Sequence, residues 1–220
     1  MSKAQSPKSE VKRLELPTVY PITDTRISGL SHLEQVERLI DGGAKLIQLR
    51  EKHASPREFY DQAVECIAYA RPRDVKIIIN DRVDIALMTG ADGAHLGQDD
   101  MPPDAARRVL GPERIIGYST HSVEQAVAAT ALGVDYIAIG PAYQTRTKED
   151  PDPAVGIEGI SAVRDQIGDV ALVAIGGIDA SNIDEVLAAG ADSVAMISGI
   201  LASAKGITAA MSDLLTAAKR

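Results

Sequence analysis

The sequence predicts an α/β protein built as a single-domain (β/α)₈ TIM barrel. Eight short apolar runs, rich in β-branched residues, alternate with eight helical patterns along the chain. The runs lack polar alternation, which is typical of parallel strands covered on both faces. The length of 220 residues suits one α/β barrel, and no change in composition marks a second domain. Eight strand–helix pairs in order favour a closed barrel over an open sheet.

The expected strands are the apolar runs themselves, each four or five residues long. They are residues 18–22, 45–49, 76–79, 93–96, 114–117, 136–139, 172–175 and 193–197. The expected helices between them are residues 32–40, 56–70, 83–88, 103–110, 123–132, 159–167, 183–188 and 207–218. Several of these helices follow a residue suited to cap their first turn, namely Ser31, Ser55, Ser122 and Ser181.

A near-repeat joins several helices to the strands that follow them. It reads DGGAKLIQ, ALGVDYIAIG and AAGADSVAMI, with TGADGAHLG as a shorter version. In each copy a glycine is expected to end the helix in a left-handed conformation, before a small apolar residue leads into a buried strand. Residues 1–16 are expected to form a flexible N-terminal tail, and residues 17–220 the catalytic barrel.

Composition excludes several classes of protein. The net charge of −8 leaves no basic stripe for nucleic acid, and with no Trp and one Phe a base-stacking surface is not expected. No apolar run approaches the roughly 20 residues of a membrane span, and the polar N-terminus does not resemble a secretory signal. Cys66 is the single cysteine, so a cytoplasmic location and a packed structural thiol are expected.

Polar or glycine residues follow every expected strand. Because a barrel builds its active site from the loops after its strands, these residues are the candidates for chemistry. Asp81 and Asp100 follow neighbouring strands and could converge on Mg²⁺, which takes one or two carboxylates and completes its shell with water and phosphate. The alternative is that each aspartate caps the short helix after it. Arg50, Lys52 and Lys148, which also follow strands, favour a metal–diphosphate site.

The last two expected strands end in Gly176-Gly177 and Ser198-Gly199. Many barrels bind phosphate with these two loops, where glycine lets backbone N–H groups approach the phosphate oxygens. The alternative is that these two segments only form turns. The segment TRTK, residues 145–148, offers two hydroxyls and a cation in a loop that could cover a substrate or form a surface turn. No Ser-His-Asp arrangement is evident, and His95 within a strand is expected to be a hydrogen-bonded packing residue.

Taken in order, YPITD, QLREK, INDRVDIAL, GADGAHLGQDD, IGYSTHS, DYIAIGPAYQTRTKED, AIGGI and MISGI resemble the motifs of the thiamine phosphate synthase family over residues 18–200. The resemblance implies that the aminopyrimidine diphosphate is bound by Gln48, Arg50, Lys52, Asn80, Ser119 and Lys148. It implies that Thr145, Thr147, Gly177, Ile197 and Ser198 contact the thiazole phosphate. It also makes Asp81 and Asp100 the magnesium ligands, and Ser119 and Lys148 the catalytic residues. Gln144 and Gly199 depart from the common family pattern without removing a candidate ligand.

The implied reaction joins 4-amino-5-hydroxymethyl-2-methylpyrimidine diphosphate to 4-methyl-5-(2-hydroxyethyl)thiazole phosphate, or its carboxylated form, with release of diphosphate. It needs Mg²⁺ and cationic side chains for the departing diphosphate, but no protein nucleophile. Three alternatives stay open: a related thiazole tautomerase, a non-catalytic phosphometabolite sensor, and another barrel enzyme of sugar-phosphate or tryptophan metabolism. A homo-oligomer is compatible with the sequence.

Overall fold

The computed structural model describes residues 14–144 and 153–218 and forms a closed barrel of eight parallel strands. Each strand pairs with its neighbours in the sequence, and β8 pairs with β1 to close the ring. The strands are β1 Val19–Thr23, β2 Leu46–Leu49, β3 Lys76–Asn80, β4 Gly93–Leu96, β5 Ile115–Thr120, β6 Tyr136–Ile139, β7 Ala171–Ile175 and β8 Ser193–Met196. The predicted barrel is thereby confirmed.

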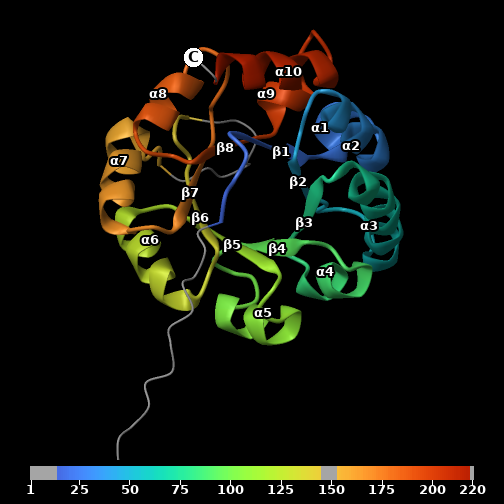
Figure 1. Ribbon diagram of the computed structural model, residues 1–220, viewed down its shortest axis with the longest axis horizontal. Coiled ribbons are helices and arrows are strands. Elements are labelled where there is room, and N and C mark those ends of the chain that lie inside the picture. Colours follow the sequence, from blue (N-terminus) through green and yellow to red (C-terminus); the bar gives the residue numbers. More distant parts are fainter. Residues whose placement is uncertain (1–13, 145–152, 219–220) are drawn as a thin grey trace, which may run out of the picture.

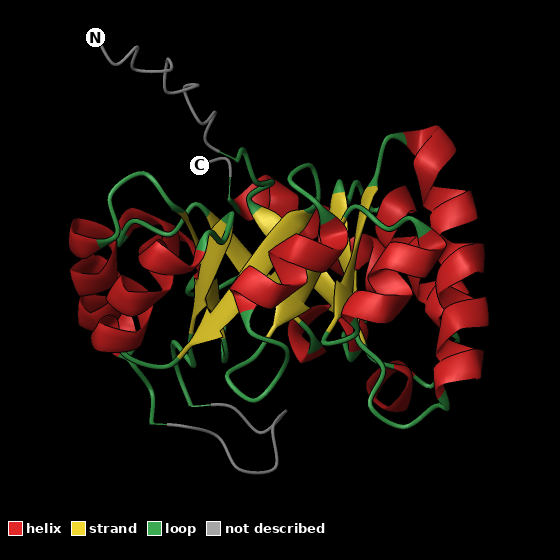
Figure 2. Cartoon of the chain, turned by 90° about the horizontal axis from the view of Figure 1, so that it is seen from below, coloured by secondary structure: helices red, strands yellow, loops and turns green. Residues whose placement is uncertain are grey.

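Helices surround the strands as an outer ring (Figure 1), and seen from the side the sheet lies enclosed between them (Figure 2). The described α-helices are α1 Thr25–Ser28, α2 His32–Asp41, α3 Pro56–Ala70, α4 Val83–Thr89, α5 Pro103–Leu110, α6 Val123–Ala129, α7 Gly156–Gln166, α8 Ile183–Ala188, α9 Ser198–Leu201 and α10 Ile207–Ala217. Two short 3₁₀ turns, Arg71–Arg73 and Thr130–Leu132, extend α3 and α6. The sequence did not predict α1 and α9, which are four residues long and carry no periodic signal.

Three of the four predicted helix caps are confirmed. The Ser31 and Ser55 side chains each accept from the backbone three residues on and form complete capping boxes, and Ser122 caps α6. Such a cap stabilises a helix by about 1 kcal/mol. The prediction for Ser181 is wrong, because its backbone N–H and hydroxyl both bond the Asp179 carboxylate and Asn182 precedes α8 instead.

The glycines of the near-repeat end their helices as expected. Gly43, Gly90, Gly133 and Gly190 all have positive φ values, between 68° and 104°. In this left-handed region a side chain is strained, so glycine is the residue of choice there. A buried strand begins three residues after each of these glycines.

The core has two layers, one between the strands and the helices and one inside the barrel. Cys66 lies in the outer layer, where burial raises the pKa of its thiol to about 12, as expected of a packed structural thiol. Leu14 and Leu16 pack against the inner layer, whereas residues 1–13 of the predicted tail lie outside the described residues. None of the described helices is both long and apolar enough to span a membrane.

The inner layer changes from apolar to polar towards the carboxyl ends of the strands. Alternate residues of a strand point to the same face, so Gln48 shares the interior side with Leu46, and Asn80 shares it with Ile78. Leu46 and Ile78 belong to the apolar cluster, and the residues two places further on carry amides. The fold therefore presents polar side chains to the mouth of the barrel.

Candidate active site at the carboxyl ends of the strands

Gln48 and Asn80 place two buried amides inside the barrel near its mouth. Their relative exposures are 2% and 7%, and the Gln48 Nε2 donates to the Tyr20 hydroxyl at 3.2 Å. The Asn80 Nδ2 is buried and has no hydrogen-bond partner among the described residues. An unsatisfied buried donor costs roughly 1–3 kcal/mol, so an acceptor on a bound molecule would remove that cost.

Arg50 follows β2 and contacts the Asp24 carboxylate through Nη1. Asp24 is itself fixed, because its side chain accepts from the backbone of Arg26 and Ile27 and so caps α1. The sequence predicted Arg50 as an anion binder but gave Asp24 no role. The carboxylate holds the guanidinium over the end of β2, and the remaining N–H groups of such a planar fork can bind phosphate oxygens.

Lys52, Asp81 and Asp100 form a charged cluster over the ends of β2, β3 and β4. The Lys52 ammonium contacts the Asp81 carboxylate. Burial raises the pKa of Asp100; the Gly97 N–H, which donates to the Asp100 Oδ2 at 2.7 Å, lowers it, and the adjacent Asp81 carboxylate raises it again. A neighbouring carboxylate that raises the pKa of Asp100 is a common sign of a functional site, and two adjacent carboxylates favour a cation between them.

The backbone at Asp81 supports a functional role for this residue. Its φ is 63°, in the left-handed region that non-glycine residues seldom adopt, and its N–H donates to the His95 carbonyl at 2.8 Å. The alternative that the two aspartates cap helices is wrong, since Arg82 precedes α4 and Pro102 precedes α5. Neither carboxylate caps a helix.

The two aspartates suit a magnesium site in which the protein supplies only part of the ligand set. Within residues 14–144 and 153–218 no group of three or more His, Cys, Asp or Glu side chains could hold a metal ion. Mg²⁺ commonly binds one or two carboxylates and takes its other ligands from water and substrate phosphate. A pair of interacting carboxylates beside Lys52 and Arg50 matches that pattern better than it matches an all-protein metal cage.

Ser119, near the end of β5, lies beside a buried imidazole. The Ser119 Oγ is 2.8 Å from the His95 Nε2, and the His95 Nδ1 is 2.9 Å from the Tyr136 hydroxyl. Burial lowers the pKa of His95 to about 4, so the ring is neutral and a weak base at neutral pH. His95 is thus hydrogen-bonded and packed, as the sequence predicted, whereas Tyr136 and Tyr20 were missed. Their contacts depend on which residues the strand register places together, as with Gly117 beside Tyr136, and a single sequence does not reveal this.

The ends of β7 and β8 form the other side of the mouth. Gly176 and Gly177 have φ values of 100° and 66°, and a Cβ on Gly177 would lie 2.7 Å from the Tyr143 Cβ. Ile197 follows β8 directly, and Ser198 begins α9. A Cβ on Gly199 would approach a backbone carbonyl to 3.2 Å, so a small residue suits this position. The predicted residues Thr145, Thr147 and Lys148 lie outside the described residues.

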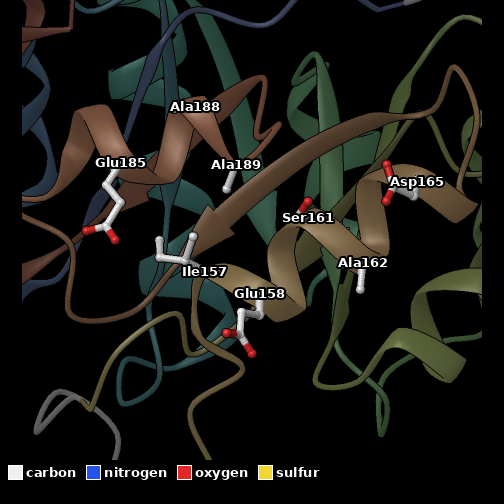
Figure 3. A pocket seen from close by; sticks show the side chains of 8 residues that line it. All are labelled: Ile157, Glu158, Ser161, Ala162, Asp165, Glu185, Ala188 and Ala189. Atoms are coloured by element: carbon white, nitrogen blue, oxygen red, sulfur yellow. The ribbon is translucent and has the colours of Figure 1, made fainter.

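A hollow on the outer surface between α7 and α8 is not part of this site (Figure 3). Its lining includes the carboxylates of Glu158, Asp165 and Glu185 around Ala188 and Ala189, and no basic residue. Such a surface repels phosphate. The candidate site is therefore the barrel mouth, where arginine, lysine, amide and glycine groups gather.

Fold and site together define a barrel enzyme whose charged residues lie at the carboxyl ends of parallel strands. A family model described as thiamine monophosphate synthase matches residues 19–200. The chain is 43% identical over 197 residues to the thiamine-phosphate synthase of Chloroflexus aurantiacus, covering 89% of this chain and 90% of that protein. It is 45% identical over 186 residues to the one of Methanospirillum hungatei, covering 84% and 90%.

Solved structures agree with these relatives. Thiamine phosphate pyrophosphorylase from Pyrococcus furiosus superposes with a TM-score of 0.83 at 34% identity, covering 92% of this chain and 95% of that one. N-(5'-phosphoribosyl)anthranilate isomerase from the same organism, at 15% identity and a TM-score of 0.66, shares the fold alone. The chain belongs to the thiamine monophosphate synthase family and is an enzyme of the transferase class.

Proposed function

We propose that the protein is a thiamine-phosphate synthase that joins 4-amino-5-hydroxymethyl-2-methylpyrimidine diphosphate to 4-methyl-5-(2-hydroxyethyl)thiazole phosphate, or to its carboxylated form. The products are thiamine phosphate and diphosphate. The observation that carries the proposal is the cluster of Lys52, Asp81 and Asp100 beside Arg50. It combines two carboxylates for a metal with two cations for a diphosphate at one side of the barrel mouth.

The proposed site has two halves. Arg50, Lys52 and the metal-binding aspartates would hold the diphosphate over β2 to β4, and Gln48, Asn80 and Ser119 would hold the pyrimidine below it. Gly177, Ile197 and Ser198, with Thr145 and Thr147, would bind the thiazole phosphate over β7 and β8. Lys148 would also contact the diphosphate. The orphaned Asn80 Nδ2 supports this division, since it leaves a buried donor for the first substrate.

The proposed reaction is a dissociative substitution. The bond between the exocyclic methylene carbon and the diphosphate oxygen breaks, and its electron pair leaves with the diphosphate. The pyrimidine amino group stabilises the cation that forms, and the thiazole nitrogen then attacks the methylene carbon to make the new C–N bond. The side chains of Arg50, Lys52 and Lys148 stabilise charge gathering on the departing diphosphate, and no protein nucleophile takes part.

Asp81 and Asp100 would hold Mg²⁺. Bound there, the ion supplies positive charge to the diphosphate oxygens and so makes the diphosphate a better leaving group. Two features support this role. Neither carboxylate caps a helix, and the Gly97 N–H donates to the Asp100 Oδ2 and so orients that carboxylate. The Lys52 ammonium, which contacts the Asp81 carboxylate, would lie beside the ion and the diphosphate.

A thiazole tautomerase would need a base able to take a proton near neutral pH. His95, the imidazole bonded to Ser119 in the barrel interior, has a pKa of about 4 and is a poor candidate. The direct test is incubation of the protein with both substrates and Mg²⁺, followed by detection of thiamine phosphate, with each substrate omitted in turn. Product that requires both substrates supports the proposal. Isomerisation of a thiazole phosphate carboxylate without coupling would overturn it.

A further inference from the structure

Five side chains from five strands form one hydrogen-bonded chain across the barrel interior. Gln48 donates through Nε2 to the Tyr20 hydroxyl at 3.2 Å, and the hydroxyls of Tyr20 and Tyr136 are 3.1 Å apart. The Tyr136 hydroxyl is 2.9 Å from the His95 Nδ1, and the His95 Nε2 is 2.8 Å from the Ser119 Oγ. The chain starts at one proposed substrate contact, Gln48, and ends at another, Ser119.

A glycine in a neighbouring strand leaves room for this hydrogen-bonded chain. A Cβ on Gly117 would lie 2.0 Å from the Tyr136 Cζ and 2.3 Å from its hydroxyl oxygen, so glycine is needed for the ring to lie where it does. The rings of His95 and Tyr136 stack with centroids 5.5 Å apart and planes 17° apart, and the two tyrosine rings meet edge to face. Packing fixes the rings, so the hydroxyls have few other places to donate.

The available donors and acceptors determine the direction of donation along this hydrogen-bonded chain. Tyr20 accepts from Gln48, and among the described residues its remaining hydrogen-bond partner is Tyr136, so its own proton goes there. Tyr136 then accepts from Tyr20 and donates to the His95 Nδ1. With the Gln48 amide in this orientation, the opposite direction would leave the buried Tyr20 proton without an acceptor, at the cost of an unmade hydrogen bond. A neutral imidazole that accepts at Nδ1 carries its proton on Nε2 and donates it to Ser119.

We propose that Tyr20, Tyr136 and His95 are positioning residues that set the polarity of both ends of the chain. Because Ser119 accepts from His95, it presents its own hydroxyl proton to a ligand. Because Gln48 commits an N–H to Tyr20, it presents its carbonyl oxygen. An acceptor and a donor held in this way select a heteroaromatic ring that carries both an amino group and ring nitrogens, and this choice of ligand rests on the proposed function.

The experiment is nitrogen NMR of the histidine rings in the full ligand-free chain near neutral pH. The four histidines of the sequence allow His95 to be assigned by comparison with His95→Asn. The expected result is a proton on Nε2 and a bare Nδ1. A proton on Nδ1 would mean that the chain runs the other way, with the Gln48 amide turned over, and would overturn the proposal.

Two single-atom deletions sharpen the test. Tyr136→Phe keeps the ring but removes the donor to Nδ1, so we expect the Nδ1–H form to appear alongside the Nε2–H form. Tyr20→Phe leaves the Tyr136 donor in place, so the original tautomer is expected to persist. Tyr69→Phe, on α3 outside the barrel, is the matched control and should change neither nitrogen signal. An unchanged His95 tautomer in Tyr136→Phe would show that the Tyr136 hydroxyl does not determine which ring nitrogen carries the proton.

Kinetics separate positioning from packing. In Tyr136→Phe we expect the KM for the aminopyrimidine diphosphate to rise about tenfold, with kcat and the KM for the thiazole phosphate within about twofold of wild type. An equal change in both KM values, or no change in either, would overturn the role. The NMR measurement needs no substrate. A protein that makes no thiamine phosphate would therefore defeat the proposed function and leave the tautomer result to be judged by itself.

Discussion

The His95 Nε2 lies 2.8 Å from the Ser119 Oγ, the spacing of a general base and a nucleophile, yet this pair is not built to attack. A catalytic triad places a carboxylate on the far nitrogen of the imidazole. Here the far nitrogen faces the Tyr136 hydroxyl, and burial lowers the pKa of His95 to about 4. Ser119 therefore keeps its proton. The relationship agrees with a reaction in which substrate atoms, and not a protein side chain, form the new bond.

The buried imidazole of His95 predicts how stability depends on pH. Its pKa is about 4 in the folded protein against 6.5 for an ordinary histidine, so between these values the unfolded chain binds the proton more readily. The free energy of unfolding should fall by about 3 kcal/mol as the pH drops from 6.5 to 4. Urea unfolding of wild type and His95→Asn across this window measures it, and identical pH slopes in the two proteins would contradict it.

The charge on Asp81 should be needed for turnover. Asp81→Asn keeps a residue that tolerates the left-handed backbone, with φ at 63°, and removes one of two interacting carboxylates. We expect kcat to fall about 10²–10³-fold with the unfolding free energy little changed, and the same loss for Lys148→Ala. Asp84→Asn, which removes an exposed carboxylate paired with Arg82, is the control. Wild-type turnover in Asp81→Asn would remove this residue from the site.

Gly117 should be required for the interior tyrosine. Gly117→Ala places a Cβ 2.0 Å from the Tyr136 Cζ, so either the ring or the strand must move. Overpacking of this kind costs roughly 1–3 kcal/mol, and displacement of the ring should also weaken binding of the aminopyrimidine diphosphate. Chemical unfolding and substrate titration measure the two effects. Gly159→Ala, on α7, is the comparison, and equal stability of the two variants would argue against the crowding.

Gly177 offers a test of the phosphate half of the site. Gly177→Ala combines a φ of 66° with a Cβ only 2.7 Å from the Tyr143 Cβ, whereas Gly133→Ala has a φ of 69° and open space. Both variants should lose about 1 kcal/mol of stability from backbone strain. Only Gly177→Ala should also raise the KM for the thiazole phosphate. The new Cβ would displace Tyr143, which closely precedes the predicted thiazole phosphate contacts Thr145 and Thr147 in the sequence. A similar KM in both would dissociate Gly177 from that substrate.

Much of the fold was predictable because the local signals agree with one another. The serines at 31, 55 and 122 cap helices, and the glycines at 43, 90, 133 and 190 end them, as their spacing indicated. Ser181 misled because its hydroxyl bonds the nearby Asp179 carboxylate, a competing contact that sequence spacing does not reveal. The helices α1 and α9 were missed since four residues are too few to show a period.

The site was predictable where its residues lie at or directly after the strand ends. Residues that follow strands, such as Lys52 and Asp81, could be placed together because parallel strands end on the same face. Partners that depend on register across the barrel could not: Asp24 holds Arg50 across 26 positions, and Tyr20 meets Tyr136 across 116. Such pairs arise from strand pairing in space, and a single sequence carries no signal for them.

The most direct test of the account is the rate of thiamine phosphate formation from the two purified substrates, measured before chelation of divalent metal, after it, and after Mg²⁺ is returned. If the Asp81 and Asp100 carboxylates hold the ion that neutralises the departing diphosphate, the rate should fall at least about a hundredfold on chelation and recover with Mg²⁺. No product from both substrates in the presence of Mg²⁺, or product that forms undiminished after the metal is removed, would contradict the account.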